Sequence, residues 1–444
     1  MRPRLALSAL ALLASCASGP KPAPAAAGAP PPAAAAAPGQ PIGLPPPKVT
    51  PPATHDPAAR ASFAQAVQLA QAGDTAGAER ALNDVLQRDS RLDHAWTDLG
   101  VLAERRGDLA GAEKDYRQAL ALAPDQAAAW DFLARLLCRQ GRAQEAQQLA
   151  QARCTAAPEA SGPRNALAFA LLQLNQPQAA EAEAKKVLKD DERNVRAMQL
   201  LAGAYFREGK YELAKLVLEN ARAVDPTDAG THNLLGSTLL KLKQRPLARE
   251  EFRAAAQSCP DFAEARNNYG VMLVEAGDFD AAVRELEAAV ALAPDFVPAR
   301  LNLGNAYRGK LALQQAEAQY QKVVALQPAL ADTYFNLAIL NLDSDLPGVD
   351  TVDRMNRAIA YFKTYREKGG SDDRVDQYLK DAAKGIDREQ RRKEREKKDQ
   401  LRKVEKDKEA AAAPSKAAPS GKPASKTQAT PPAQAPAKLG ADNK

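Results

Sequence analysis

Residues 93–126 read DHAWTDLGVLAERRGDLAGAEKDYRQALALAPDQ, and the pattern of this stretch returns at a period equal to its own length from residue 59 to about residue 366. Counting in steps of 34 gives three aligned series. The first series contains only small residues: Ala66, Gly100, Ala134, Ala168, Ala202, Gly236, Gly270, Gly304 and Ala338. The second lies twelve residues later and is alanine throughout: Ala78, Ala112, Ala146, Ala180, Ala214, Ala248, Ala282 and Ala316. The third is mostly proline: Ser90, Pro124, Pro158, Glu192, Pro226, Pro260, Pro294 and Pro328.

These series predict a helical hairpin that is repeated nine times. Two small residues twelve apart allow the two helices of a hairpin to approach closely, because an added methylene there would cost about 1 to 3 kcal/mol of overpacking. Proline ends the second helix, since it lacks a backbone N–H and disfavours the helical conformation of the residue before it. Apolar residues one place before the first small position fill the core: Leu99, Leu133, Leu167, Leu201, Leu235, Tyr269, Leu303 and Leu337.

Small residues at repeat positions 8 and 20 with proline at position 32 resemble the tetratricopeptide repeat (TPR). Residues 93–126 carry the resemblance best, through Trp96, Leu99, Gly100, Ala112, Tyr116, Ala119 and Pro124. The resemblance implies an all-α fold over residues 59–370, a right-handed superhelical solenoid of about nine TPR hairpins in which each hairpin packs on its neighbours. Glu192 replaces the proline after the fourth repeat, and we expect a looser join there.

Residues 1–16 predict a secretory signal peptide. Arg2 and Arg4 precede an apolar run that is too short to cross a bilayer as a helix. The run ends in Leu13-Ala14-Ser15-Cys16, which resembles a bacterial lipobox and implies that Cys16 is lipidated. Ala17 follows in place of an inner-membrane retention aspartate, so the resemblance implies an outer-membrane anchor facing the periplasm. The alternative is an ordinary signal peptide with an incidental cysteine.

Three further segments lie outside the repeats. Residues 17–58 are rich in Pro and Ala and predict a disordered linker, which is a passive tether or, alternatively, a recognition motif. Residues 371–386 carry an apolar stripe at helical spacing and predict a helix that caps the solenoid. Residues 387–411 predict a charged, solvated or coiled-coil helix, and residues 412–444 a disordered Ala/Pro/Lys tail.

The net charge of +6 is carried by the ends of the chain. Residues 1–58 have a net charge of +3 and residues 387–444 of +7, which leaves −4 for residues 59–386. A nucleic-acid-binding fold needs a basic footprint on its folded surface, so we expect no nucleic-acid partner. Three cysteines follow Cys16, and the offset between Cys138 and Cys154 along antiparallel helices exceeds what a disulfide spans. We therefore predict no structural disulfide in the repeats.

Candidate ligand-binding residues lie on the first helix of each repeat, which lines the concave face of TPR solenoids. An asparagine series occupies positions 5, 6 and 9: Asn233, Asn267, Asn268, Asn302, Asn305 and Asn336. Amides offer paired donors and acceptors to the backbone of an extended peptide, and this series resembles the asparagine ladder of peptide-binding TPR proteins. The alternative is that these amides hydrogen-bond between adjacent repeats. A basic series at position 13 predicts contact with acidic segments: Arg105, Arg139, Arg207 and Lys241.

No grouping of residues in the sequence predicts catalysis, a cofactor or a metal site, so we expect a protein that is not an enzyme. The repeats, the proline-rich linker and the lipobox together are similar to outer-membrane TPR lipoproteins of pilus, secretion and myxobacterial gliding-motility machines. This resemblance implies a periplasmic scaffold that binds protein or peptide segments of an envelope complex. The alternative is a structural lipoprotein whose basic tail binds peptidoglycan while the repeats act as a spacer.

Overall fold

The computed structural model describes residues 57–343, 346 and 348–412, and the secondary structure of these residues is helical throughout. The predicted signal peptide with Cys16, nearly all of the linker and the tail lie outside them. The helices are α1 (Pro57–Gln71), α2 (Thr75–Arg88), α3 (Asp93–Arg105), α4 (Leu109–Leu122), α5 (Ala127–Arg139), α6 (Ala143–Ala156), α7 (Ser161–Gln173), α8 (Pro177–Asp190), α9 (Val195–Arg207), α10 (Tyr211–Val224), α11 (Ala229–Lys241), α12 (Arg245–Ser258), α13 (Ala263–Ala276), α14 (Phe279–Leu292), α15 (Val297–Gly309), α16 (Leu313–Leu326), α17 (Ala331–Asp343), α18 (Thr351–Glu367) and α19 (Val375–Ala412).

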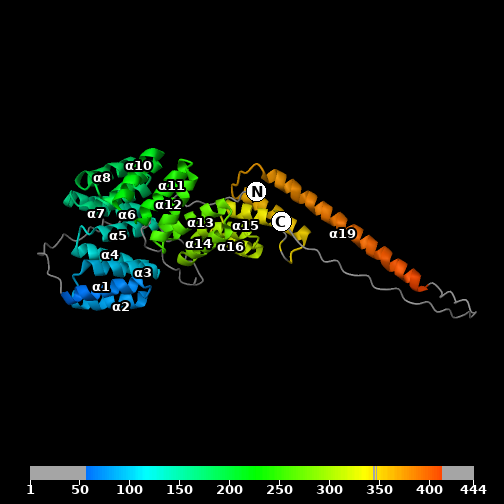
Figure 1. The fold of residues 1–444 in the computed structure, drawn as a ribbon, viewed down its shortest axis with the longest axis horizontal. Coiled ribbons are helices and arrows are strands. Elements are labelled where there is room, and N and C mark those ends of the chain that lie inside the picture. The colour runs from blue at the N-terminus through cyan, green and yellow to red at the C-terminus, as the bar shows by residue number, and fades with distance from the viewer. Residues whose placement is uncertain (1–56, 344–345, 347, 413–444) are drawn as a thin grey trace, which may run out of the picture. The chain divides into compact units, whose positions relative to one another are not determined.

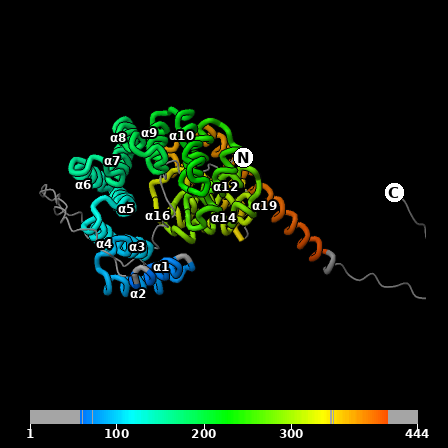
Figure 2. Tube along the Cα trace, turned by 60° about the vertical axis from the view of Figure 1, so that its left-hand side comes forward, coloured from blue at the N-terminus to red at the C-terminus, as the bar shows by residue number. Residues whose placement is uncertain are grey.

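The first eighteen helices form nine antiparallel hairpins, each packed on the one before it (Figure 1). The hairpins wind as a right-handed superhelical solenoid, which confirms the all-α fold predicted from the repeat period. The odd-numbered helices from α3 to α9 line the inner side of the curve that these hairpins follow (Figure 2). This arrangement brings the predicted ligand-facing positions of successive repeats side by side.

At the glycines of position 8, a side chain of the second helix lies close to the backbone of the first helix. A Cβ atom added to Gly100 would lie 2.5 Å from the ring of Tyr116. The four glycines of the series each face a large side chain: Gly100 with Tyr116, Gly236 with Phe252, Gly270 with Leu286 and Gly304 with Tyr320. The close approach predicted from the sequence is thus confirmed, and three of these four glycines face an aromatic ring.

The turn inside each of the first eight hairpins has a left-handed backbone at position 15. Five of these residues are glycines with φ between 76° and 85°: Gly73, Gly107, Gly141, Gly209 and Gly277. Three repeats hold the same conformation with a side chain: Asn175, Lys243 and Leu311, with φ between 57° and 63°. Because a left-handed conformation costs an L-residue roughly 1–2 kcal/mol, packing on both sides of the turn must impose it.

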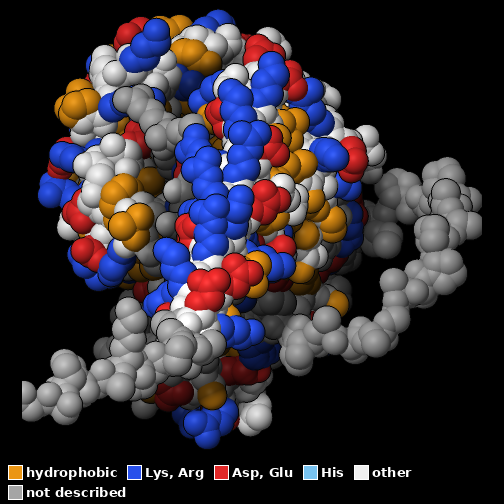
Figure 3. All heavy atoms as spheres, turned by 90° about the vertical axis from the view of Figure 1, so that its right-hand side faces the viewer, with side chains coloured by type: hydrophobic (Ala, Val, Ile, Leu, Met, Phe, Trp, Pro, Cys, Tyr) orange, Lys and Arg blue, Asp and Glu red, His pale blue; other side chains and the backbone are white. Residues whose placement is uncertain are grey.

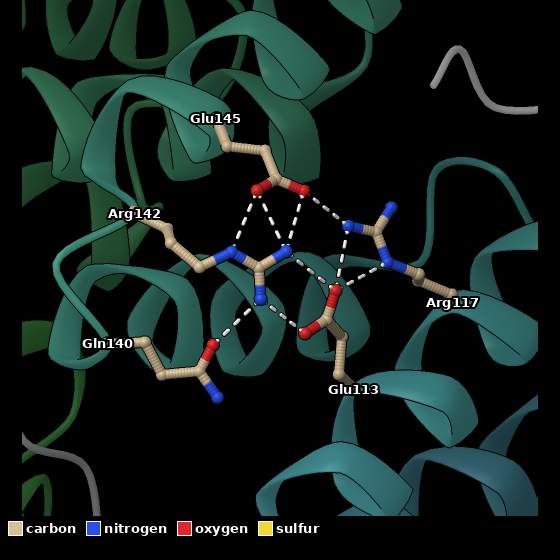
Figure 4. A network of polar contacts seen from close by, with 5 residues as sticks. All are labelled: Glu113, Arg117, Gln140, Arg142 and Glu145. Carbon is tan, nitrogen blue, oxygen red and sulfur yellow. Dashed lines mark hydrogen bonds and ion pairs between the residues drawn. The ribbon is translucent and has the colours of Figure 1, made fainter. Parts of the chain in front are cut away.

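A charged network joins the outer helices of the second and third hairpins (Figure 4). Arg142 donates to Glu113 at 2.6 Å and to Glu145 at 2.8 Å, and Arg117 donates to Glu145 at 2.7 Å. Gln140 accepts a further bond from Arg142 at 2.8 Å. Hydrogen bonds from Arg142 lower the pKa of Glu113 although burial raises it. The network therefore holds α4 and α6 together while the carboxylates are ionised.

The chain divides into two compact units, Met1–Ile386 and Asp387–Lys444. The helix α19 begins in the first unit, where Val375 and Tyr378 are buried against aromatic side chains of the ninth hairpin. The ring of Tyr378 stacks on Phe362 with centroids 5.4 Å apart. The helix begins at Val375 rather than at Ser371, and the segments predicted as a capping helix and a charged helix are one continuous helix.

The two cysteines of the third repeat follow the prediction. Cys138 and Cys154 are free thiols, as their offset predicts, and burial raises the pKa of Cys138 to about 12. Because both are free, no disulfide joins two cysteines of the repeats, and the prediction is not contradicted in the described residues.

Candidate functional site

The predicted asparagine series lies in the interior between the inner helices. Asn268 Nδ2 donates to Asn233 Oδ1 at 3.0 Å, and Asn302 Nδ2 donates to Asn267 Oδ1 at 2.9 Å. Asn267 also donates to Asn268 at 3.1 Å, and these four side chains are at most 3% exposed. The amides thus form the inter-repeat hydrogen bonds that the alternative interpretation expects, across α11, α13 and α15. Their contact with a ligand stays a prediction.

The hydrogen bonds between these asparagines follow one pattern, and this pattern does not continue to Asn336 in the last repeat. A position-6 amide donates to a position-5 amide of the preceding repeat, and Leu301 occupies position 5 ahead of Asn336. Asn336 is 1% exposed, and neither atom of its amide has a hydrogen-bond partner among the described residues. Asn305, in contrast, accepts from the Tyr320 hydroxyl at 2.8 Å. Asn336 is therefore the one predicted ladder residue whose amide the described part of the repeats leaves unsatisfied.

The predicted basic series is divided between paired and unpaired cations. Arg139 forms an ion pair with Glu104, and burial lowers the pKa of Arg139. Lys241 is exposed, and its ammonium lies 5.9 Å from the centroid of the Phe206 ring. Arg207 is half-buried and forms no ion pair with any described residue. Of the predicted cations, Arg207 and Lys241, at the same position of adjacent repeats, are the two without a protein carboxylate in the described ranges.

A second charged group that sequence reasoning missed lies on α5 and α9. Arg135 donates to Asp131 at 2.5 Å, and Arg196, from two repeats further on, forms an ion pair with the same carboxylate. Arg196 also stacks over the ring of Phe169 with 5.6 Å between guanidinium carbon and centroid. Burial raises the pKa of Asp131, but the two guanidinium groups outweigh it and hold the pKa below its usual range. Asp131 to Arg135 is an i, i+4 pair visible in the sequence, whereas no local spacing relates Arg196 to either residue.

A third recurring contact, which sequence reasoning also missed, is made by side chains of different chemical types. At position 4, seven side chains donate to the backbone carbonyl six residues earlier: Trp96, Trp130, Arg164, His232, Arg266, Arg300 and Tyr334. Met198 has no donor at this position, and it follows Glu192, where the proline is missing. The backbone of that join is regular, since α9 begins five residues after α8 ends as at other joins. The join expected to be looser differs from the others in this hydrogen bond.

The turn before the seventh hairpin lies close to the first two hairpins. Arg105 on α3 lies with Nη2 3.9 Å from Asp261 Oδ2, in the turn between α12 and α13. Beside this contact is a cavity of about 510 Å³, lined by α1, α2, α3 and residues 258–261. Such a volume is within the range of small-ligand and peptide side-chain pockets. The structure brings these elements together although four whole hairpins separate them along the chain.

Two negative findings concern the described residues alone. None of the helices in the described ranges combines the length and apolarity that a membrane span requires. Likewise, the described side chains contain no group of three or more His, Cys, Asp or Glu placed to hold a metal ion.

Comparison with known proteins identifies the family. Sequence models of the tetratricopeptide repeat match residues 94–126, 171–237, 233–295 and 273–331. Residues 94–126 and 171–331 are thus tetratricopeptide repeats, and repeats of this kind stack into extended binding surfaces for proteins and peptides. No curated protein matches the chain.

One solved structure supports the fold, and two others are similar over part of the chain. The chain is similar to a structure of the APC/C hetero-tetramer Cut9–Hcn1, at 17% identity and a TM-score of 0.57, with 72% of this chain and 63% of that chain covered. It thus spans less than two thirds of that chain. A tetratricopeptide repeat protein from Parabacteroides merdae matches at 16% identity and a TM-score of 0.40, covering 56% of this chain and 99% of that chain. YrrB, described as a TPR protein with an unusual peptide-binding site, matches at 24% identity and a TM-score of 0.34, covering 43% and 98%.

Proposed function

We propose that this protein is a lipid-anchored scaffold of the bacterial envelope, attached through Cys16 to the outer membrane and facing the periplasm. In this proposal the solenoid binds protein or peptide segments of an envelope machine of the gliding-motility, pilus or secretion type. The observation that supports it best is a nine-hairpin TPR solenoid that follows a lipobox-like sequence and a proline-rich linker. The TPR fold is typically a non-catalytic scaffold, which agrees with the expectation that the protein is not an enzyme.

Arg207 and Lys241 give a clearer test of partner binding than the asparagines do. Replacing Asn268, Asn302 and Asn336 would break inter-repeat hydrogen bonds, so a loss of binding would have two explanations. Arg207 and Lys241 have no protein carboxylate to lose within the described ranges. Charge reversal at these two positions therefore changes the surface without breaking an ion pair of the repeats.

The experiment is affinity purification of the full chain from membranes, followed by mass spectrometry of the bound proteins. We expect the Arg207→Glu, Lys241→Glu variant to lose partners that the wild type retains. The matched control is Arg88→Glu, Lys322→Glu, an equal charge change at one exposed arginine of α2 and one exposed lysine of α16, neither of which forms an ion pair with a described residue, and it should retain them. Equal partner lists for all three proteins would refute the groove as the binding surface.

The lipid anchor is tested separately. Mass spectrometry of the mature N-terminus should show a lipid-modified residue 16 in the wild type, and Cys16→Ala should abolish the modification and release the protein from membranes. An unmodified mature terminus of the wild type would contradict the anchor and support the ordinary signal peptide. Partner binding in vitro does not depend on this result.

The alternative function is a cell-wall-binding structural lipoprotein. Lys and Arg side chains gather along the charged half of α19, with Asp and Glu between them (Figure 3). Under this alternative, deletion of residues 384–444 abolishes the envelope attachment that is independent of the lipid. Under the scaffold proposal the same deletion leaves partner binding intact.

A further inference from the structure

The cavity beside α1 and α3 has mainly apolar walls. Ala66, Val67 and Ala70 contribute from α1, and Val101 and Leu102 contribute from α3. The turn of residues 258–261 closes its opposite side. Apolar walls favour aliphatic side chains of a ligand, because removing apolar surface from water is favourable in proportion to the area buried.

The charges in this cavity are unbalanced. Asp98 lines it from α3, half-buried and without a hydrogen bond to any described residue. Burial raises the pKa of Asp98 to about 6, and His94 opposes this only in part. Arg105, seven residues further along the same helix face, lies beside Asp261. A ligand that complements the cavity therefore carries a cation next to aliphatic side chains.

The chain itself contains such a segment shortly before α1. Residues 17–56 contain only three large aliphatic side chains, and all three lie within eight residues: Ile42, Leu44 and Val49. Lys48 is adjacent to them and is the last Lys or Arg before Pro57. Three prolines separate Leu44 from Lys48 and restrict the backbone before binding, which lowers the entropy lost on docking.

The length of the chain permits this segment to reach the cavity. Nine residues from Lys48 to Pro57 span at most about 30 Å when extended. Ala66 lies about 14 Å along α1 from its first residue, at about 1.5 Å per residue. The extended chain from Lys48 to Pro57 is therefore longer than the distance along α1 from Pro57 to Ala66.

We propose that residues 42–49 bind in cis in the cavity between the first two hairpins and the α12–α13 turn. The aliphatic side chains pack on its walls, and the Lys48 ammonium pairs with the Asp98 carboxylate. The linker then occupies the amino-terminal part of the inner surface, and a partner that enters there must displace it. This goes beyond the scaffold proposal and depends on neither the lipid anchor nor any partner.

Photocrosslinking in the full-length protein tests the contact. A benzophenone amino acid replaces Val67 in the cavity wall or, as a control, Asp84 on the exposed face of α2. After irradiation, digestion and mass spectrometry, we expect crosslinks from position 67 to residues 42–49 within one chain and none from position 84. Lys48→Glu should reduce the yield from position 67 about fivefold, the effect of roughly 1 kcal/mol.

Lys48→Glu lies outside the solenoid, so its effect cannot arise from misfolded repeats. Combining it with Asp98→Lys should restore the yield, provided that circular dichroism shows the repeats folded. A crosslink from position 67 to a second copy or to another protein in place of residues 42–49 would overturn the proposal. An unchanged yield in Lys48→Glu would overturn the ion pair, and with it the assignment of this segment.

Discussion

The end of the asparagine ladder gives a prediction with an internal control. Asn302 and Asn336 occupy the same position of adjacent repeats, and both are at most 1% exposed. The amide of Asn302 donates to Asn267, whereas the amide of Asn336 has no partner among the described residues because Leu301 occupies the acceptor position. Leucine is close in shape to asparagine, so Asn→Leu at both sites changes the polarity with little change in packing.

The two substitutions should change the free energy of unfolding differently, although both bury the same leucine side chain. Asn336→Leu removes an unsatisfied buried amide, which stabilises the repeat by about 1–3 kcal/mol. Asn302→Leu leaves the buried Asn267 oxygen without its donor, which costs about 1–3 kcal/mol. Because the transfer of leucine from water contributes equally to both variants, the difference between their unfolding free energies is about 2 to 6 kcal/mol.

Hydrogen exchange is the appropriate assay, since long repeat arrays do not unfold in one cooperative step. Exchange followed by mass spectrometry should show stronger protection of α17 in Asn336→Leu and weaker protection of α13 and α15 in Asn302→Leu. Equal changes in the two variants, or weaker protection in Asn336→Leu, would refute the reasoning. If Asn336→Leu also abolished partner binding while protecting α17, the amide would be a ligand contact.

Three further predictions concern single positions. Gly100→Ala should lower the thermal midpoint, because overpacking against Tyr116 of about 1–3 kcal/mol exceeds the helix-propensity gain of about 1 kcal/mol; an unchanged midpoint would contradict the contact. Leu311→Gly should raise the free energy of unfolding in urea by roughly 1–2 kcal/mol through relieved left-handed strain, since Leu311 is 77% exposed and contributes little packing. The hydrogen bond to Glu251 raises the pKa of His232, so its contribution to stability is complete below about pH 6.5 and is lost as the pH rises through the raised pKa. His232→Gln should remove that part of the pH dependence of denaturation.

The sequence indicated which positions recur but not what each side chain contacts. The asparagines lie on the first helices of their repeats, as predicted, but the sequence left open whether they contact a ligand or one another. The structure shows that Asn233 and Asn267 accept hydrogen bonds from Asn268 and Asn302. That pairing joins two residues of adjacent repeats that stand in neighbouring columns of the repeat alignment. The alignment compares residues within a column, so it does not detect bonds between columns.

The position-4 side chains are a second case in which the repeat alignment does not detect a contact. Trp96, Arg164, His232 and Tyr334 share no chemistry that a pattern of residue types detects. What they share is a donor long enough to reach one backbone carbonyl of the preceding turn. The position of the carbonyl requires only a donor atom at the right distance, whereas sequence alignment groups residues by size and polarity.

The hairpin, the nine repeats and their all-α stacking were predictable from the chain alone, because they depend on the sizes of residues at fixed local spacing. The arrangement of the repeats in space establishes which polar groups are satisfied, which cations remain unpaired, and that residues 258–261 approach α3. Those outcomes arise from the rotation of each repeat relative to the last. The rotation accumulates over several repeats and brings together side chains such as Arg105 and Asp261, which no local spacing relates.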